Sequence, residues 1–271
     1  MGDGTHRIAL TIAGSDSGGG AGIQADLKTF AAFGCFGTSV VTAITAQNTL
    51  GVRAIHAVPV DIVAAQLAAL AEDLPPEACK SGMLATREIV EKVASVIATS
   101  GWSRYVLDPV MVSTSRDTLL ADDAVDAMRA LLLPLAACVT PNLDEAERLT
   151  GFAVHDPDAM VRAGRALLDL GAHAVLIKGG HLKSDILVDI LVTADTVQRY
   201  TRRRVATNAT HGTGCTLAAA ITAAMANGQQ LHDAVPVAIE YVQAAMRAAP
   251  GLGRGQGPLW HGVEVNQGSS S

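Results

Sequence analysis

The sequence predicts an α/β fold in which helices cover both faces of a central, mostly parallel sheet. Short apolar segments alternate with longer segments of helical periodicity, and such alternation is typical of parallel strands joined by helices. Hydrophobic residues make up 49% of the sequence and charged residues 17%, which is sufficient for a large core. No repeat or low-complexity linker divides the chain, so we expect a single domain over residues 7–262, with flexible termini at 1–6 and 263–271.

Apolar runs and the turn residues that follow them predict the elements of the first half. The first strand stops at Gly14, and Asp108-Pro109 interrupts the last one. The segment Gly51–Pro59 is a candidate edge strand or lid. In order, we expect a strand at Ile8–Ala13, a helix at Leu27–Phe33, a strand at Ser39–Ile44, a helix at Ile62–Ala71, a short apolar run at Ala78–Leu84, a helix over 86–99 and a strand at Tyr105–Val112.

The second half continues the alternation and then changes direction. Two apolar segments joined by a short turn, Ile186–Thr193 and Thr196–Val205, predict an antiparallel pair. In order, we expect a helix over 118–133, a strand at Ala136–Thr140 ending at Pro141, two helices, a strand at Ala174–Ile177, the antiparallel pair, and apolar helices over 213–227 and 232–248.

Charge and cysteine usage argue against several classes of protein. The net charge of -6 is opposite to the excess expected of a non-specific nucleic-acid binder. The N-terminus lacks a signal-peptide core, and the most apolar stretch, 127–140, is too short to span a bilayer, so we expect neither a nucleic-acid nor a membrane partner. The four cysteines form no C-x-x-C pair and no zinc spacing, which predicts a cytoplasmic protein with reduced thiols. Three of them, Cys35, Cys79 and Cys138, lie in apolar runs and are expected to pack in the core.

Polar and glycine-rich segments gather at the predicted carboxyl ends of the strands. Open parallel sheets bind ligands at this edge, so we expect the site there. The segments are Gly14-Ser15-Asp16, Gln47-Asn48, Lys80-Ser81-Gly82, Asp108, Asn142 and Lys178-Gly179-Gly180.

The first glycine-rich segment, Gly14–Asp26, fits two nucleotide motifs poorly. Its G-x-G-x-x-A pattern follows a strand, as in dinucleotide-binding folds, but no acidic residue for the ribose occurs between Asp26 and Asp61. A Walker A loop is also excluded, because no Gly-Lys-Ser/Thr follows. The segment is therefore either a loop whose backbone approaches a ligand or a tight strand-to-helix turn.

The second segment, residues 208–216, opens a long apolar helix. Free amides at a helix start bind anions, and Gly212 and Gly214 would let those amides close around a phosphate-like group. The helix start is also expected to lower the pKa of Cys215, so that this residue could hold negative charge or accept a proton. The alternative is an ordinary capped helix with a buried cysteine.

Three further signals have two interpretations each. Asp108 either holds Mg²⁺ or forms a turn before Pro109. The segment 142–145 either contributes ligands or only starts a helix with acidic residues in its first turn. Lys178 either reaches an anion as a point charge or is an exposed residue at a strand end.

Several of these segments, in this order, carry a resemblance that covers about Ile8 to Trp260. The chain resembles the hydroxymethylpyrimidine/phosphomethylpyrimidine kinases of thiamine biosynthesis, in the ribokinase-like superfamily. The matching blocks are Ala13–Asp16 with Gly18–Lys28, Thr45–Thr49, Lys80–Leu84, Leu107–Met111, Thr140–Asn142, Lys178–His181 and His211–Thr216.

The resemblance implies a ribokinase-like three-layer sandwich, ATP as co-substrate, Mg²⁺, and two successive phosphorylations of a pyrimidine. The alcohol 4-amino-5-hydroxymethyl-2-methylpyrimidine would be converted first to its monophosphate and then to its diphosphate. A homodimer is also expected. The nearest alternative is a pyridoxal or pyridoxine kinase, and a second is a non-catalytic pyrimidine-binding sensor on the same fold.

The resemblance also implies roles for individual residues. Gln47 would hydrogen-bond the pyrimidine edge, in a pocket lined by Gly14, Asp26, Met83 and Val110. The anion hole at the transferring phosphate would consist of Gly212, Thr213 and Gly214, with Cys215 at the place of the catalytic Asp of many relatives. Asp108 and Glu145 would place Mg²⁺, with Asn142 beside them for ATP, and Lys178 would neutralise ATP phosphate charge.

One segment departs from the family pattern. Thr114 and Arg116 stand where many relatives carry Lys and Gly. Either Arg116 substitutes for that Lys at a phosphate, or the loop has a different shape.

Overall fold

The computed structural model describes residues 6–111, 121–180 and 185–265. Thr114 and Arg116 lie outside the described residues, as do the outer parts of both predicted flexible termini, 1–5 and 266–271. Among the residues that are described, we find no helix combining the length and apolar character that crossing a membrane requires.

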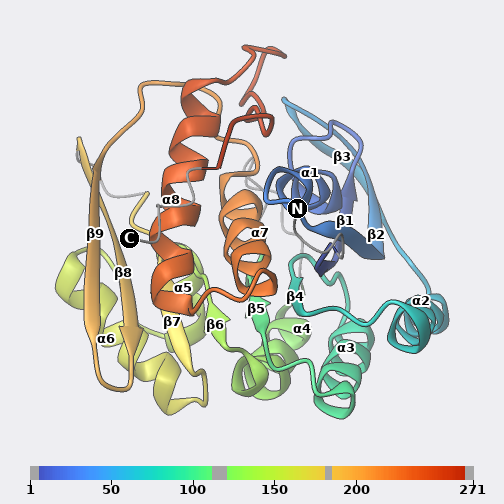
Figure 1. The fold of residues 1–271 in the computed structure, drawn as a ribbon. Coiled ribbons are helices and arrows are strands. Elements are labelled where there is room, and N and C mark those ends of the chain that lie inside the picture. The colour runs from blue at the N-terminus through green and yellow to red at the C-terminus, as the bar shows by residue number, and fades with distance from the viewer. Residues whose placement is uncertain (1–5, 112–120, 181–184, 266–271) are drawn as a thin grey trace.

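The described residues form one nine-stranded sheet with the order β3-β2-β1-β4-β5-β6-β7-β8-β9 (Figure 1). The central pairs are parallel, whereas β2–β3, β7–β8 and β8–β9 are antiparallel. The strands are β1 (Ile8–Asp16), β2 (Phe36–Asn48), β3 (Gly51–Ala57), β4 (Ala78–Ser81), β5 (Tyr105–Leu107), β6 (Cys138–Val139), β7 (Ala174–Ile177), β8 (Ile186–Thr193) and β9 (Val197–Arg203).

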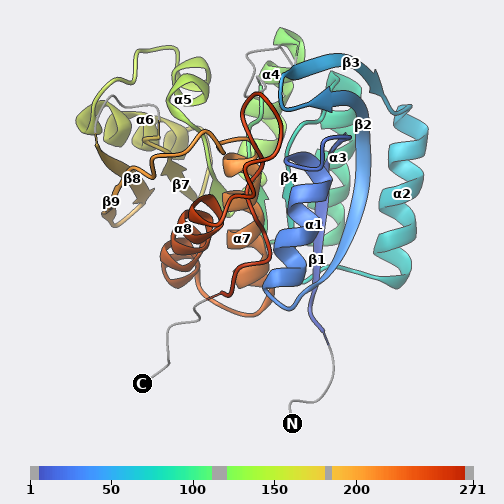
Figure 2. The same ribbon diagram turned by 90° about the horizontal axis from the view of Figure 1, so that it is seen from above.

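Helices cover the two faces of this sheet as separate layers (Figure 2). One face packs against α2 to α6 and the other against α1, α7 and α8. Neighbouring residues of a strand enter different layers, as the two-residue period of a strand requires: Val106 packs under α7, and Leu107 packs on the opposite face. The helices are α1 (Gly22–Ala32), α2 (Val60–Asp73), α3 (Arg87–Ser100), α4 (Asp122–Ala127), α5 (Leu143–Thr150), α6 (Pro157–Asp169), α7 (Thr213–Ala226) and α8 (Leu231–Arg247).

Helix α7 is buried along most of its length. Every residue from Thr216 to Ala226 is buried, and the helix packs against α1 and α8 as well as the sheet. Alanine dominates this stretch, so the neighbouring elements can approach it closely. Its N-terminus lies at the carboxyl edge of the sheet, where the site was expected.

The predicted fold class is confirmed, together with the antiparallel pair and the strand Ala174–Ile177. Gly51–Pro59 proves to contain an edge strand. The prediction that Gly14 ends the first strand is wrong: a register shift between Ala13 and Ser15 lets β1 pair with β2 as far as Asp16.

The helix predicted over 118–133 is also wrong in part. It is α-helical only to Ala127, continues as a π-helical turn at Met128–Leu132 and ends in a 3-10 turn at Leu133–Leu135. Pro134 lacks the amide hydrogen that a continuing α-helix needs. The predicted strand at Tyr105–Val112 stops at Leu107, immediately before Asp108-Pro109.

The strand order creates a switch point beside β1. From β1 the chain moves outward to β2 and β3, and α2 then returns it to β4 on the other side of β1. Connections leave a crevice at the carboxyl edge of such a sheet.

Candidate active site

A cleft of about 900 Å³ lies at the carboxyl edge of the sheet. It brings together nearly all the residues singled out from the sequence. Of those, the cleft is lined by Gly14, Gln47, Met83, Asp108, Val110, Asn142, Glu145, Lys178, Gly212, Thr213, Gly214 and Cys215.

The start of α7 forms the part of the cleft that is suited to bind a phosphate-like anion. No side chain caps this helix, and Gly212 at its N-cap has a φ of 84°, a left-handed conformation that favours glycine. A Cβ on Gly212 would lie 1.8 Å from the carbonyl oxygen of Gly20, so only glycine fits this position. The uncapped amides and the helix dipole provide an anion site.

Charged side chains that follow β5 and β7 meet a carboxylate of α5 beside this helix start. The Nζ of Lys178 lies 3.1 Å from Oδ1 of Asp108 and 3.8 Å from Oε2 of Glu145. A Cβ on Gly214 would lie 3.2 Å from Nζ of Lys178, so the ammonium group borders the anion site. Burial would lower the pKa of Lys178, but Asp108 and Glu145 outweigh it and raise that pKa, so the group stays charged.

Glu145 has a structural contact in addition to its place in the cleft. Its carboxylate accepts the amide hydrogen of Asn142 at 2.8 Å, and the Asn142 side chain accepts the amide hydrogen of Glu145 at 2.9 Å. This capping box starts α5, so residues 142–145 do form a helix start, and Asn142 and Glu145 line the cleft as well. Burial raises the pKa of Glu145 to about 7, although Lys178 opposes that rise.

The predicted low pKa of Cys215 is wrong. Burial raises the pKa of this thiol to about 12, and nearby Asp26 and Asp108 add to the rise, whereas Lys80 and the Gly22 amide oppose it. Enclosure by the protein therefore outweighs the helix start, and the thiol is neutral near pH 7 in this site.

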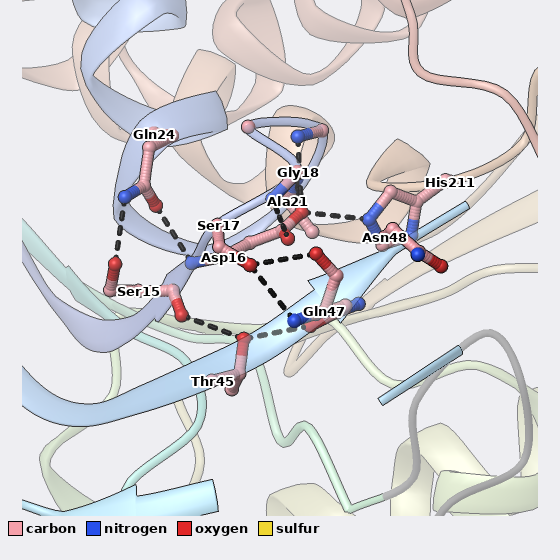
Figure 3. A network of polar contacts seen from close by, with 12 residues as sticks. Ser15, Asp16, Ser17, Gly18, Ala21, Gln24, Thr45, Gln47, Asn48 and His211 are labelled. Atoms are coloured by element: carbon pink, nitrogen blue, oxygen red, sulfur yellow. Dashed lines mark hydrogen bonds and ion pairs between the residues drawn. The ribbon is translucent and has the colours of Figure 1, made fainter. Parts of the chain in front are cut away.

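The pocket residues implied by the resemblance belong to the same cleft. Gly14, Met83 and Val110 line it, and Sδ of Met83 lies 3.1 Å from the place of a Cβ on Gly14. Glycine at position 14 thus leaves room beside the Met83 side chain. The Oε1 of Gln47 accepts a hydrogen bond from Thr45 at 3.1 Å (Figure 3), which orients the amide.

Asp26 is not among the residues that line the cleft. It is fully buried below the cleft, where its Oδ2 accepts hydrogen bonds from Thr11 at 2.6 Å and Lys80 at 2.8 Å. Burial raises the pKa of Asp26, although Lys80 opposes the rise.

Sequence reasoning missed two groups of lining residues. Asp16 and His211 belong to predicted motifs but received no role of their own, because only the fold brings them together. An apolar wall from the β9–α7 connection and α8 was also missed, since its spacing matches that of any buried helix face. Its members are Val205, Ile239, Val242 and Met246.

Comparison with known proteins places the chain in a family. The sequence profile of the phosphomethylpyrimidine kinase family matches residues 16–260. A hydroxymethylpyrimidine/phosphomethylpyrimidine kinase of Rhizobium meliloti (strain 1021) is 52% identical over 257 residues, which cover 94% of this chain and 96% of that protein.

Solved structures share the ribokinase-like three-layer fold. A phosphomethylpyrimidine kinase from Clostridium difficile 630 matches with a TM-score of 0.79 and 44% identity, covering 88% of this chain and 99% of that one. An ADP complex of Bacillus subtilis pyridoxal kinase matches with a TM-score of 0.89 and 38% identity, covering 95% and 98%. The chain therefore belongs to the phosphomethylpyrimidine kinase family.

Proposed function

We propose that this enzyme uses ATP to phosphorylate 4-amino-5-hydroxymethyl-2-methylpyrimidine to its monophosphate and then to its diphosphate, in thiamine diphosphate biosynthesis. One observation carries the proposal: a single cleft contains both a pocket edged by Gln47 and an uncapped helix start beside Lys178. The relative from Rhizobium meliloti, which carries both kinase activities in its name, supports the assignment.

The acceptor pyrimidine occupies the end of the cleft near Gln47. The amide of Gln47 can donate and accept at once, which matches a ring nitrogen beside an amino group. Gly14, Met83 and Val110 provide the close apolar walls of this pocket. Asp26 lies beneath these walls and supports the pocket indirectly, through its ion pair with Lys80. Both residues are fully buried.

The phosphoryl group transfers at the start of α7. Such reactions have a loose transition state, so binding geometry and charge neutralisation supply most of the acceleration. Amides at Gly212, Thr213 and Gly214 stabilise the transferring group, and Lys178 neutralises phosphate charge on ATP, with Asn142 nearby.

The carboxylates near Lys178 fit a magnesium ion. Oδ2 of Asp108 is buried and has no hydrogen-bond partner among the described residues. Asp108 and Glu145 would hold the ion, and Mg²⁺ is commonly bound by one or two carboxylates together with substrate phosphates. Bound there, it would neutralise charge that develops on the phosphates.

Cys215 lies where the alcohol would lose its proton. Because the thiol is neutral near pH 7, it can accept that proton only as a thiolate, which forms after positive charge lowers its pKa. Lys80 already acts in that direction, and a bound cation would add to it.

An ATP-consumption assay with hydroxymethylpyrimidine, its monophosphate and pyridoxal tests the proposal. We expect turnover with both pyrimidines. The resemblance to the Bacillus subtilis pyridoxal kinase makes a vitamin B6 kinase the second candidate; turnover of pyridoxal without turnover of the monophosphate would select it. Binding of the pyrimidine with no ATP consumption would select a non-catalytic sensor.

We further propose that the enzyme is a cytoplasmic homodimer. Exposed apolar side chains on β2, β3 and the turn between them, Ile44, Leu50 and Ile55, support self-association. The four free cysteines fit a reducing compartment. Light scattering on the purified enzyme tests the assembly, and a monomer at micromolar concentration would contradict it.

A further inference from the structure

Two loops of the cleft meet at a buried contact between Asp16 and His211. The Nε2 of His211 lies 2.8 Å from Oδ2 of Asp16 (Figure 3), and only 3% of Asp16 and 7% of His211 is exposed. Asp16 is the last residue of β1 and closely follows Gly14 of the acceptor pocket in sequence. His211 immediately precedes Gly212 of the anion hole. The contact therefore joins the acceptor side of the cleft to the phosphate side.

Asp16 also organises the glycine-rich loop after β1. Its carboxylate accepts amide hydrogens from Gly18 at 2.8 Å, Gly20 at 3.0 Å and Ala21 at 2.9 Å. Burial would raise the pKa of Asp16, but the hydrogen bonds from His211 and the loop amides outweigh it and hold that pKa below its usual range. The side chain is thus a carboxylate at neutral pH, and charge-assisted bonds of this kind are the strong ones.

The two loops are in close contact at Gly20 and Gly212. A Cβ on Gly20 would lie 2.5 Å from Cδ2 of His211, and a Cβ on Gly212 would lie 1.8 Å from the carbonyl oxygen of Gly20. The His211 amide also donates to the Gly257 carbonyl at 3.2 Å. Movement of the imidazole would therefore displace the backbone of both loops.

We propose that Asp16 and His211 are positioning residues, which set the distance between the acceptor hydroxyl and the anion hole. This inference rests on the proposed function. Phosphoryl transfer needs the reacting atoms about 3–3.5 Å apart and aligned. The pair fixes the end of β1, which carries Gly14 of the acceptor pocket, against the first residue of the anion hole.

The proposal predicts which kinetic parameter changes. Neither side chain is placed against a reacting atom, so loss of the contact leaves each substrate bound but misaligned. A misplacement of about 1 Å can lower a rate about a hundredfold. The side-chain amide nitrogen of a glutamine lies about as far from the backbone as Nε2 of histidine, so glutamine should still donate a hydrogen bond to Asp16. Alanine cannot.

Steady-state kinetics of H211A and H211Q test the assignment. We expect kcat to fall between about tenfold and a hundredfold in H211A, with the KM values for ATP and pyrimidine within about threefold of wild type, and H211Q to recover most of kcat. K28A is the matched control: Lys28 donates to the Gly19 carbonyl at 2.7 Å from the solvent side of the same loop. Its loss should leave kcat unchanged.

Several outcomes would overturn the inference. They are a kcat for H211A equal to that of K28A, a rise in KM at constant kcat, or an equal loss of kcat in H211A and H211Q with equal thermal stability. If H211A does not fold, His211→Asn replaces it, because its shorter arm keeps a polar group and breaks the contact. A wild-type enzyme that consumes no ATP with any acceptor would instead contradict the proposed function.

Discussion

Oδ1 of Asp108 lies 3.1 Å from Nζ of Lys178, across 70 positions of sequence. Asp108 immediately follows β5 and Lys178 immediately follows β7, and the pair borders the start of α7. Within the proposed mechanism the ammonium group serves the phosphates of ATP, and Asp108 keeps that group charged and in place.

Replacing Lys178 should therefore affect both activity and stability. We expect Lys178→Met to lower kcat by about 10²-fold or more, the cost of removing one preorganised electrostatic group. The variant should also unfold more easily, because Asp108 is left buried and unpaired. Adding Asp108→Asn should restore part of the thermal stability but no activity. An active Lys178→Met enzyme would remove Lys178 from the mechanism; Arg87→Ala, at an exposed ion pair on α3, is the control.

Gln47 should affect the affinity for the pyrimidine and not the affinity for ATP. In Gln47→Leu the edge contact to the ring is lost, so we expect the KM for hydroxymethylpyrimidine to rise about tenfold or more, the consequence of leaving a polar ligand edge unpaired. The KM for ATP should not change, because Gln47 lies at the acceptor end of the cleft. Initial-rate measurements with each substrate varied in turn check this, and a parallel rise in both KM values would contradict the placement.

Cys215 should matter more for the first phosphorylation than for the second. The alcohol must lose a proton, whereas the monophosphate already carries negative charge near neutral pH. We expect Cys215→Ala to lower the rate with the alcohol about 10²-fold, within the range of general-base catalysis, and the rate with the monophosphate much less. Equal losses would mean that Cys215 only shapes the site. Cys138→Ala, which removes a buried thiol in the sheet, controls for loss of a cysteine.

His261 should destabilise the enzyme in acid. Burial lowers its pKa to about 4, and its Nε2 lies 3.0 Å from Oγ1 of Thr216 on α7. Between pH 6.5 and 4 the unfolded chain therefore binds a proton that the folded chain does not. Linkage then makes the free energy of unfolding fall as the pH falls through this range, by up to about 3 kcal/mol for this group.

The variant His261→Gln isolates this effect. Denaturant unfolding of both proteins at pH 7 and pH 4.5 should show a smaller acid loss for the variant. The raised pKa of Glu145 acts in the opposite sense, since it makes stability fall as the pH rises from 4.5 to 7. It is common to both proteins and cancels in the difference. Identical pH dependence of the two would contradict the buried, neutral state of His261.

The sequence was sufficient to predict the sheet and the location of the cleft, because both follow from local patterns. Buried strands read as apolar runs, and polar residues mark their carboxyl ends. Lys178 and Asn142 were identified in this way. The strand end at Asp16 was missed, since a bulge after Ala13 depends on pairing with β2 rather than on Gly14 itself.

Properties that depend on surroundings could not be predicted. The pKa of Cys215 is set by how completely the protein encloses the thiol, and the motif reports only the helix start. The ion pair between Asp26 and Lys80 joins a helix to a strand far away in sequence, and the family resemblance, which could not show this pair, implied that Asp26 lines the pocket. The contact between Asp16 and His211 spans 195 positions and has no local signature.

The enclosure of α7 also bears on how the enzyme can evolve. Because no residue from Thr216 to Ala226 faces solvent, few substitutions in this helix would be neutral. Larger side chains would clash with the sheet or with α1 and α8. We therefore expect changes in substrate preference to arise in the loops that line the rest of the cleft. Helix α7, which carries the phosphate-binding amides, should stay unchanged.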